Sequence, residues 1–385
     1  MGEKDERAFL RGWQEQRVSG TGMAFWQHIT TAHPKRKRGE FSFPKGDIVR
    51  NIGFWIIATI LSVTVQAQVK PTPRDSTQDA VSSHVPTEAP MLSGHAALHY
   101  GWQTVDGIHL FYREGGPANA PTLVLLHGSP TSSIMYQAVM EQLAGTGQLH
   151  VIAMDYPSYG YSDAPDHQQY SYTFDHIAQT VAHFLVARNI QRYALYMQDY
   201  GVPIGFRLIQ AAPNSISAII VQNGVIHLDG FPAAQDPDSK LNKYWRTRDL
   251  ASDQQFAKDA AQMPFPSSAN WTQGPNIPPD NELLTIISQQ RPGVVDAHLD
   301  LWYDYGSNMP LYPAWQNLLK SLNVPVEVIW GSHDNYFTVP GALAYLRDAP
   351  KAEIHILDAG HFATLEDPDA IATLVAGFTS RHDLR

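Results

Sequence analysis

Residues 98–380 contain short apolar runs that alternate with longer segments whose apolar residues recur at helical spacing. A short continuous apolar run is typical of a strand buried on both faces, whereas a period of three to four residues is typical of a helix. The pattern predicts strands over residues 99–105, 108–114, 122–126, 149–154, 193–197, 216–222, 324–330 and 352–357. It predicts helices over residues 133–144, 174–188, 203–211, 340–347 and 367–379. This alternation indicates an α/β fold with a mostly parallel eight-stranded sheet and helices on both faces.

The alternation is interrupted once, after the predicted sixth strand. Residues 226–315 indicate helices and loops that are rich in proline, tryptophan and tyrosine. A helical insertion between two strands of a parallel sheet is typical of a cap that encloses a pocket together with the sheet. We therefore expect a core formed by residues 97–225 and 316–385, and a helical cap over residues 226–315.

An uncharged, largely apolar run at residues 53–65 follows a segment that contains Lys45 and Arg50. The length of the run is typical of a signal-peptide core and is short for a membrane span. Residues 65–67, Val-Gln-Ala, resemble a small-x-Ala cleavage site. We interpret residues 46–67 as a secretory signal, which predicts a periplasmic or secreted protein with no stable membrane partner. If it were not cleaved, the run would anchor the chain to a membrane.

Two polar segments flank this signal. Residues 1–45 form a polar extension, and a start codon placed too far upstream would explain them. Residues 68–96 have the proline, serine and threonine content of a flexible linker. We expect ordered structure to begin near Leu98.

The composition narrows the kinds of function. With 43% hydrophobic residues, the 385-residue chain can bury a large core. Its net charge is -10, and its basic cluster at residues 35–38 lies near the N-terminus, so nothing indicates a nucleic-acid partner. The absence of cysteine excludes a thiol nucleophile, disulfides and cysteine metal sites. We expect a small-molecule substrate as the partner, and the sequence leaves a homo-oligomer open.

The strongest candidate for chemistry is the Met-Gln-Asp-Tyr-Gly segment at residues 197–201, between a predicted strand and a predicted helix. This context is typical of a nucleophile elbow, in which a sharp turn exposes one side chain at the top of the sheet. Gly201 supplies the small residue that such a turn needs. Asp199 occupies the apex, and a carboxylate there can attack carbon and form an alkyl ester. Alternatively, Asp199 could cap the following helix.

Two further motifs follow predicted strand ends. The first, His-Gly-Ser-Pro at residues 127–130, could direct backbone N–H groups into an oxyanion hole, or could be an ordinary turn. The second ends in Asp334, which could orient a histidine or could form an Asx-turn.

A candidate base follows the last predicted strand. His361 lies 27 residues after Asp334, which leaves room for a helix and a strand between acid and base (361 − 334 = 27). Asp358 and Glu366 are alternative acids, although each could instead cap a neighbouring helix. The order nucleophile, acid, base along the chain is that of one large group of hydrolases.

Together these motifs resemble the α/β-hydrolase superfamily, and more narrowly its branch of epoxide hydrolases and haloalkane dehalogenases. The matching segments are residues 126–133, 155–163, 198–201, 330–334 and 360–362. The resemblance implies that Asp199 is the nucleophile and that His361, held by Asp334, activates water. It also implies that the backbone N–H groups of Ser129 and Tyr200 form the oxyanion hole. No metal or organic cofactor is implied.

The leaving group is less well determined. Haloalkane dehalogenases usually have tryptophan after the nucleophile and often asparagine after His-Gly, whereas this chain has Tyr200 and Ser129 at these positions. Both departures disfavour halide as the leaving group. Four tryptophans could in principle supply a halide donor, although core packing explains each of them better: Trp102, Trp245, Trp302 and Trp315.

Epoxide opening requires an acid for the leaving oxygen, and epoxide hydrolases use two cap tyrosines for it. Tyr305 matches the second of them, although the arginine that usually follows is replaced by Gly306. Tyr244 is our candidate for the first. The sequence thus favours an epoxide hydrolase-like enzyme acting on a small apolar substrate. A haloalkane dehalogenase, an ester or lactone hydrolase, and a ligand-binding protein on the same fold are the alternatives.

Overall fold

The computed structural model describes residues 94–261, 277–382 and 384. All of them belong to the same structural unit of the chain. The extension at 1–45, the signal at 46–67 and most of the linker at 68–96 lie outside the described residues and stay predictions. Within the described ranges, no helix has both the length and the apolar character needed to cross a lipid bilayer.

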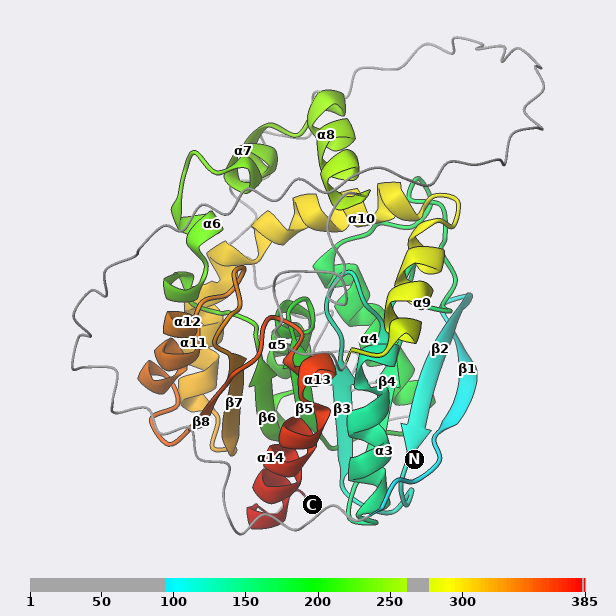
Figure 1. Cartoon of the computed structure of the whole chain (residues 1–385), viewed down its shortest axis with the longest axis vertical. Helices are drawn as coiled ribbons and strands as arrows, with labels where there is room; N and C mark the ends of the chain where they lie inside the picture. The colour runs from blue at the N-terminus through cyan, green and yellow to red at the C-terminus, as the bar shows by residue number, and fades with distance from the viewer. Residues whose placement is uncertain (1–93, 262–276, 383, 385) are drawn as a thin grey trace, which may run out of the picture. The chain divides into compact units, whose positions relative to one another are not determined.

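An eight-stranded sheet forms the centre of the fold (Figure 1). The strands are β1 (His99–Val105), β2 (Ile108–Gly115), β3 (Thr122–Leu126), β4 (His150–Met154), β5 (Tyr193–Gln198), β6 (Ile216–Gln222), β7 (Val326–Gly331) and β8 (Glu353–Leu357). Their order across the sheet is β1-β2-β4-β3-β5-β6-β7-β8. The β1–β2 and β2–β4 pairs are antiparallel, and the remaining pairs are parallel. The predicted mostly parallel, eight-stranded sheet is confirmed.

Helices cover both faces because the central strands are apolar on both sides. In β3, Leu123 and Leu125 belong to one hydrophobic cluster, and Val124 and Leu126 belong to the other. The first cluster is covered by α3 (Gln137–Gly145) and α14 (Pro368–Arg381). The second is covered by α4 (Phe174–Ala187) and α5 (Gly201–Ala211). Successive strand side chains point to opposite faces, so a fully apolar strand requires helices on each side.

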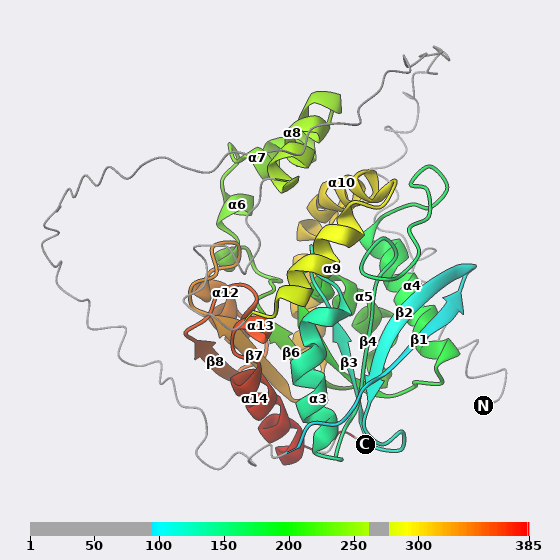
Figure 2. The ribbon, with the colours of Figure 1, turned by 45° about the vertical axis from the view of Figure 1, so that its right-hand side comes forward.

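Several helices follow β6 before the chain returns to the sheet. They are α6 (Pro232–Gln235), α7 (Lys240–Thr247), α8 (Leu250–Ala261), α9 (Pro279–Gln289) and α10 (Val294–Asp304). Figures 1 and 2 show α7, α8 and α10 above the carboxyl ends of the parallel strands. Then α11 (Tyr312–Ser321) packs against α5 and leads into β7.

Polar contacts hold these helices to the core. The backbone N–H of Phe174, the first residue of α4, donates to Asp304 Oδ2 at 2.7 Å. Arg291 Nη1 donates to the carbonyl oxygen of Ser162 at 2.5 Å. A side-chain bond to a backbone group fixes both position and direction, so the helices that follow β6 are held in place over the sheet.

Candidate active site

Asp199 lies on a sharp turn between β5 and α5. Its φ of +48° is in the left-handed region, which a residue with a side chain rarely adopts. A Cβ on Gly201 would lie 2.2 Å from the carbonyl oxygen of Leu126, so the position two residues later requires glycine. Strain of this kind is characteristic of functional turns, and the turn places Asp199 just past the carboxyl end of β5.

The turn after β3 brings Ser129 to the Asp199 carboxylate. The backbone N–H of Ser129 donates to Asp199 Oδ1 at 2.8 Å, and the N–H of Tyr200 also interacts with this carboxylate. A Cβ on Gly128 would lie 2.5 Å from Asp199 Cβ, so only glycine permits this close approach. Two converging N–H groups are the arrangement that stabilises negative charge on an oxygen.

His361 lies between the two aspartates. Its Nδ1 is 2.8 Å from Asp334 Oδ2, and its Nε2 is 3.9 Å from Asp199 Oδ2. All three residues are buried, with exposed fractions of 7% for Asp199 and 4% for the other two. Because an ionised carboxylate only accepts hydrogen bonds, the Nδ1 of His361 carries the proton, and its unprotonated Nε2 faces Asp199 and the side-chain amide of Gln198.

Burial and charge act in opposite directions on these groups. Burial raises the pKa of Asp199, although the His361 charge and the N–H groups of Ser129 and Tyr200 oppose the rise. Burial would lower the pKa of His361, but the charge and hydrogen bond of Asp334 outweigh it and raise that pKa above 6.5. The site thus combines a poorly solvated carboxylate with a histidine whose basicity is increased.

Asp334 is fixed by donors to both of its oxygens. The backbone N–H groups of Tyr336 and Phe337 donate to Oδ1 at 2.7 and 3.0 Å. Asn223 Nδ2 donates to Oδ2 at 2.7 Å, alongside His361. With this many donors the carboxylate is held in one orientation, and its charge is stabilised although it is buried.

The two alternative acids have other partners. Asp358 lies at the surface, where Oδ1 pairs with His333 Nε2 at 2.6 Å. Glu366 is buried, and its Oε2 accepts the backbone N–H of Gly360 at 2.8 Å. The carboxylate that bonds to the ring of His361 is therefore that of Asp334.

Three amide side chains around His361 were not identified from the sequence. Gln222 Nε2 donates to the carbonyl oxygen of His361 at 3.1 Å, and Asn223 reaches Asp334. Gln198 Nε2 lies 3.1 Å from His361 Nε2. The sequence did contain a signal for two of them, since Gln222 is the last residue of the predicted strand at 216–222 and Asn223 follows it directly.

The two predicted cap tyrosines have different positions. Tyr305 is buried, its ring lies 5.5 Å from that of Tyr200, and the Asp199 charge contributes to its raised pKa. Tyr244 instead donates to Asp253 Oδ1 at 2.7 Å, and its ring packs on Phe256 within the same group of helices. The structure thus brings Tyr305 to the site but commits the Tyr244 hydroxyl elsewhere.

Tyr159 is a second site tyrosine, and the sequence analysis did not single it out. Its hydroxyl donates to Ser129 Oγ at 3.4 Å. Burial and, to a smaller extent, the charge of Asp199 raise its pKa. It follows β4 in the 155–163 motif, so its position at the carboxyl end of a strand could have indicated this role.

The tryptophans considered as halide donors lie in several environments. Trp102 is 60% exposed on edge strand β1, and Trp245 Nε1 donates to the carbonyl oxygen of Trp302 at 2.8 Å. The ring of Trp302 packs against Phe256, and Trp315 is fully buried against Phe206. These contacts are those of packing residues.

Two buried polar groups near the site, His127 and Asp155, hold loops in place rather than take part in the chemistry. Burial lowers the pKa of His127 to about 4, so it is neutral, and its Nε2 accepts the backbone N–H of Tyr156 at 3.2 Å. Asp155 accepts the backbone N–H groups of Ser133 and Tyr161, each at 2.8 Å. These bonds tie the loop after β3 to the loop after β4, which positions Ser129.

Comparisons with known proteins agree with this architecture. Residues 121–368 match the family model described as alpha/beta hydrolase fold. The chain is 36% identical over 294 residues to the uncharacterized hydrolase YNR064C of Saccharomyces cerevisiae, which covers 73% of this chain and 97% of that protein.

Solved structures show the same fold. The haloalkane dehalogenase DbeA from Bradyrhizobium elkani superposes with a TM-score of 0.62 at 20% identity, covering 74% of this chain and 98% of that one. The epoxide hydrolase CorEH superposes with a TM-score of 0.61 at 20% identity, covering 74% of this chain and 99% of that one. This chain is a hydrolase that belongs to the alpha/beta hydrolase fold family; haloalkane dehalogenases are among its sequence relatives, and epoxide hydrolases share its fold.

Proposed function

We propose that this hydrolase uses Asp199 as a nucleophile, forms a covalent alkyl ester, and opens epoxides on small apolar substrates. The observation that carries the proposal is the geometry around Asp199. One carboxylate oxygen accepts the N–H of Ser129 at 2.8 Å, and the other lies 3.9 Å from His361 Nε2. A simple helix cap would need neither a buried base nor an oxyanion hole opposite the carboxylate.

In the first step, Asp199 Oδ2 attacks a carbon of the epoxide ring. A C–O bond forms to the enzyme and the C–O bond of the ring breaks, so the substrate oxygen needs a proton. Tyr305 is the donor we assign, because burial raises its pKa and keeps it protonated, and its side chain, which interacts with Tyr312, lies close enough for the charge of Asp199 to act on it. Its phenolate recovers a proton from solvent after the step.

In the second step, water cleaves the ester. His361 Nε2 takes a proton from water, and the hydroxide adds to the carboxyl carbon of Asp199. Negative charge then develops on Oδ1, where the N–H groups of Ser129 and Tyr200 stabilise it. The intermediate collapses to the free carboxylate, and the departing alkoxide takes a proton to give the diol.

A buried tyrosine beside the nucleophile favours epoxide over halide as the electrophile. Halide release needs weak N–H donors in a desolvated pocket, and Trp245 already donates to the carbonyl oxygen of Trp302. A haloalkane dehalogenase is therefore the second candidate. Hydrolysis of an ester or lactone is the third, and ligand binding without turnover is the alternative outside enzymes.

The test is a single turnover of the full chain in ¹⁸O-labelled water, with the enzyme in excess over styrene oxide, propylene oxide or 1-chlorobutane. Attack by Asp199 followed by ester hydrolysis places the label in the Asp199 carboxylate, and the first product contains unlabelled oxygen. Peptide mass spectrometry locates the label, and diol and free halide are both measured. The matched control is Asp358→Asn, which changes the surface pair with His333.

Each outcome separates the alternatives. Diol with label in Asp199 supports the proposal, whereas halide with label in Asp199 supports a dehalogenase. Label in the first product would mean that water attacks the substrate directly, and the nucleophile assignment would be wrong. If no electrophile turns over, an ester panel and then equilibrium dialysis with the same compounds distinguish an ester hydrolase from a binding protein.

A further inference from the structure

A carboxylate far from the active site has no hydrogen-bond partner among the described residues. Glu327, the second residue of β7, has no exposed surface, and neither of its carboxylate oxygens accepts a hydrogen bond from a described residue. Removing an ionised carboxylate from water without compensation costs several kcal/mol. Such a group is therefore expected either to be protonated or to bind a cation.

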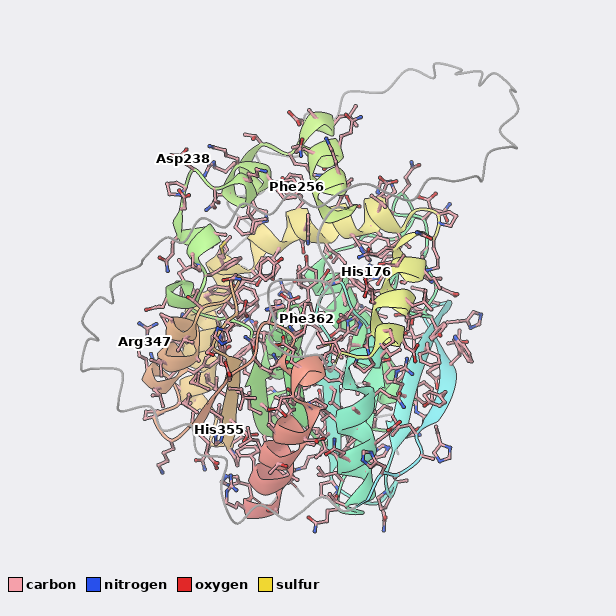
Figure 3. The ribbon with its side chains drawn as sticks, viewed as in Figure 1. His176, Asp238, Phe256, Arg347, His355 and Phe362 are labelled. Carbon is pink, nitrogen blue, oxygen red and sulfur yellow. The ribbon has the colours of Figure 1, made fainter. Side chains whose placement is uncertain are left out.

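Two further ligand-type side chains lie beside Glu327 because of the strand register. In the parallel β7–β8 pair, Glu327 lies opposite Glu353, and Ile329 lies opposite His355. Residues two apart in a strand share a face, so Glu327, Glu353 and His355 all project from the face that α14 covers. Figure 3 shows His355 on the edge strand β8, away from Phe362 beside the catalytic histidine.

The spacing of these groups fits a metal ion. His355 Nε2 lies 3.5 Å from Glu327 Oε1, and it too makes no hydrogen bond to a described residue. Zinc bonds of about 2.0–2.2 Å at tetrahedral angles place two ligand atoms about 3.4 Å apart. One ligand atom from each of Glu327, Glu353 and His355 lies within 4.8 Å of the others, so small side-chain rotations would complete the set.

The surroundings supply the other features of a metal site. Arg381 forms a salt bridge with Glu353, and His382 Nε2 lies 3.2 Å from Glu353 Oε1. Carboxylates that bind metals are commonly held by such partners. The side chains of Glu353 and His355 are partly exposed, 31% and 17%, which gives a cation a path from solvent to the buried Glu327.

We propose that Glu327, Glu353 and His355 bind one Zn²⁺ ion, with water as the fourth ligand. An imidazole nitrogen combined with carboxylate oxygens suits zinc, whereas Mg²⁺ and Ca²⁺ prefer oxygen ligands alone. The ion neutralises the buried charge of Glu327 and links the edge strand β8 to β7. The ion has a structural role, because none of the described residues of the catalytic site belongs to this cluster.

The test uses the full chain stripped with EDTA, titrated with ZnCl₂ at pH 7.5 by calorimetry and by thermal unfolding, with MgCl₂ in parallel. The variant is Glu327→Gln. The matched control is Glu114→Gln. Glu114 also pairs with a histidine and an arginine: its Oε1 lies 2.7 Å from His150 Nε2, and its Oε2 lies 2.7 Å from Arg188 Nη2. This pair lacks the second carboxylate that the Glu327 cluster has.

The proposal expects one equivalent of zinc to bind the wild-type chain and the Glu114→Gln control, with a rise in melting temperature that MgCl₂ does not produce. Affinity in Glu327→Gln falls by at least about 100-fold, because a ligand is lost. If Glu327→Gln does not fold, His355→Ala, on the edge strand, replaces it as the test variant, and its zinc affinity should fall by the same factor. The proposal is overturned if zinc leaves the wild-type melting temperature unchanged, or if the variants bind it as tightly as the wild type.

Discussion

Two clusters in this protein each combine two carboxylates with a histidine, yet they are built differently. In the catalytic cluster of Asp199, Asp334 and His361, the carboxylate of Asp334 accepts four hydrogen bonds, from Tyr336, Phe337, Asn223 and His361. Between β7 and β8, the buried Glu327 receives none from the described residues. Donated hydrogen bonds stabilise the buried charge in the first cluster, whereas in the second burial and the Glu353 charge raise the pKa of Glu327, and no hydrogen bond from a described residue opposes that rise.

The difference arises from where each cluster lies on the sheet. The catalytic groups follow the carboxyl ends of strands, where loop N–H groups are free to point at a carboxylate. Glu327 lies within β7, which pairs with β6 on one side and with β8 on the other, so the backbone groups of its own strand are engaged in the sheet. A strand interior can therefore offer a buried carboxylate only side chains, a proton or a cation.

The largest expected effect is the loss of the nucleophile. Asp199→Ala should reduce kcat by at least about 10⁴-fold while the fold is retained, because no other group can form the ester. Steady-state turnover and circular dichroism measure the two halves of this expectation. Glu327→Gln, the variant in the other cluster, should have a kcat within about twofold of the wild-type value. Full activity in the Asp199→Ala protein would refute the mechanism.

Loss of the base should separate the two chemical steps. In His361→Gln, ester formation should continue, whereas ester hydrolysis should slow by roughly 10³- to 10⁴-fold, since nothing takes the proton from water. Intact-protein mass spectrometry should then show an adduct with the mass of the substrate. Absence of the adduct in a folded variant that still binds substrate would contradict a covalent intermediate.

The pH dependence should follow the direction of the His361 shift. Because Asp334 raises the pKa of His361 above 6.5, its neutral, basic form is lost as the pH falls through that raised value. Ester hydrolysis should therefore fall about tenfold per pH unit below it. Ester formation needs ionised Asp199 and should persist to lower pH, so the adduct should accumulate in mildly acidic buffer. Stopped-flow measurements give the rate of each step as a function of pH. If ester formation and ester hydrolysis lost rate at the same acidic pH, His361 would not be the base of the second step alone.

Asn223 should act by positioning, with a smaller effect. Asn223→Ala removes one donor from Asp334 at a cost of about 1 kcal/mol, which corresponds to roughly a fivefold loss in kcat. Because a carboxylate with fewer donors is more basic, the acid limb should also move to higher pH. Asp358→Asn is the control at an exposed acid, and its pH profile should match that of the wild type. A change in activity without a shift of the profile would indicate a purely structural role for Asn223.

The two buried acids should respond differently to replacement by the amide. In buffer with EDTA, Glu327→Gln should change the unfolding free energy by less than about 1 kcal/mol, because burial raises the pKa of Glu327 and the carboxyl group is already neutral without a cation. Asp334→Asn should lower it by about 1–3 kcal/mol, because the new amide N–H groups cannot accept the hydrogen bonds that the carboxylate accepts. Urea titration measures both. Equal changes of the same sign would remove the contrast between the clusters.

Much of the fold followed from the pattern of apolar residues. The expected strand at residues 193–197 is β5, Tyr193–Gln198, and the expected strand at 216–222 is β6, Ile216–Gln222. Buried strands need apolar side chains on both faces, so their sequences are distinctive. Because Asp199, Asp334 and His361 each follow a strand of one parallel sheet, their order along the chain was enough to predict that they would meet.

The tertiary structure decided which partners each of these groups has. The hydroxyl of Tyr244 bonds to Asp253 rather than facing Asp199, because helix packing turned it that way. Glu327 meets Glu353 and His355 because of the register between β7 and β8. Local sequence determines which residues form a strand, whereas register and helix packing depend on contacts between segments far apart in the chain, and so they are fixed only when the whole core assembles.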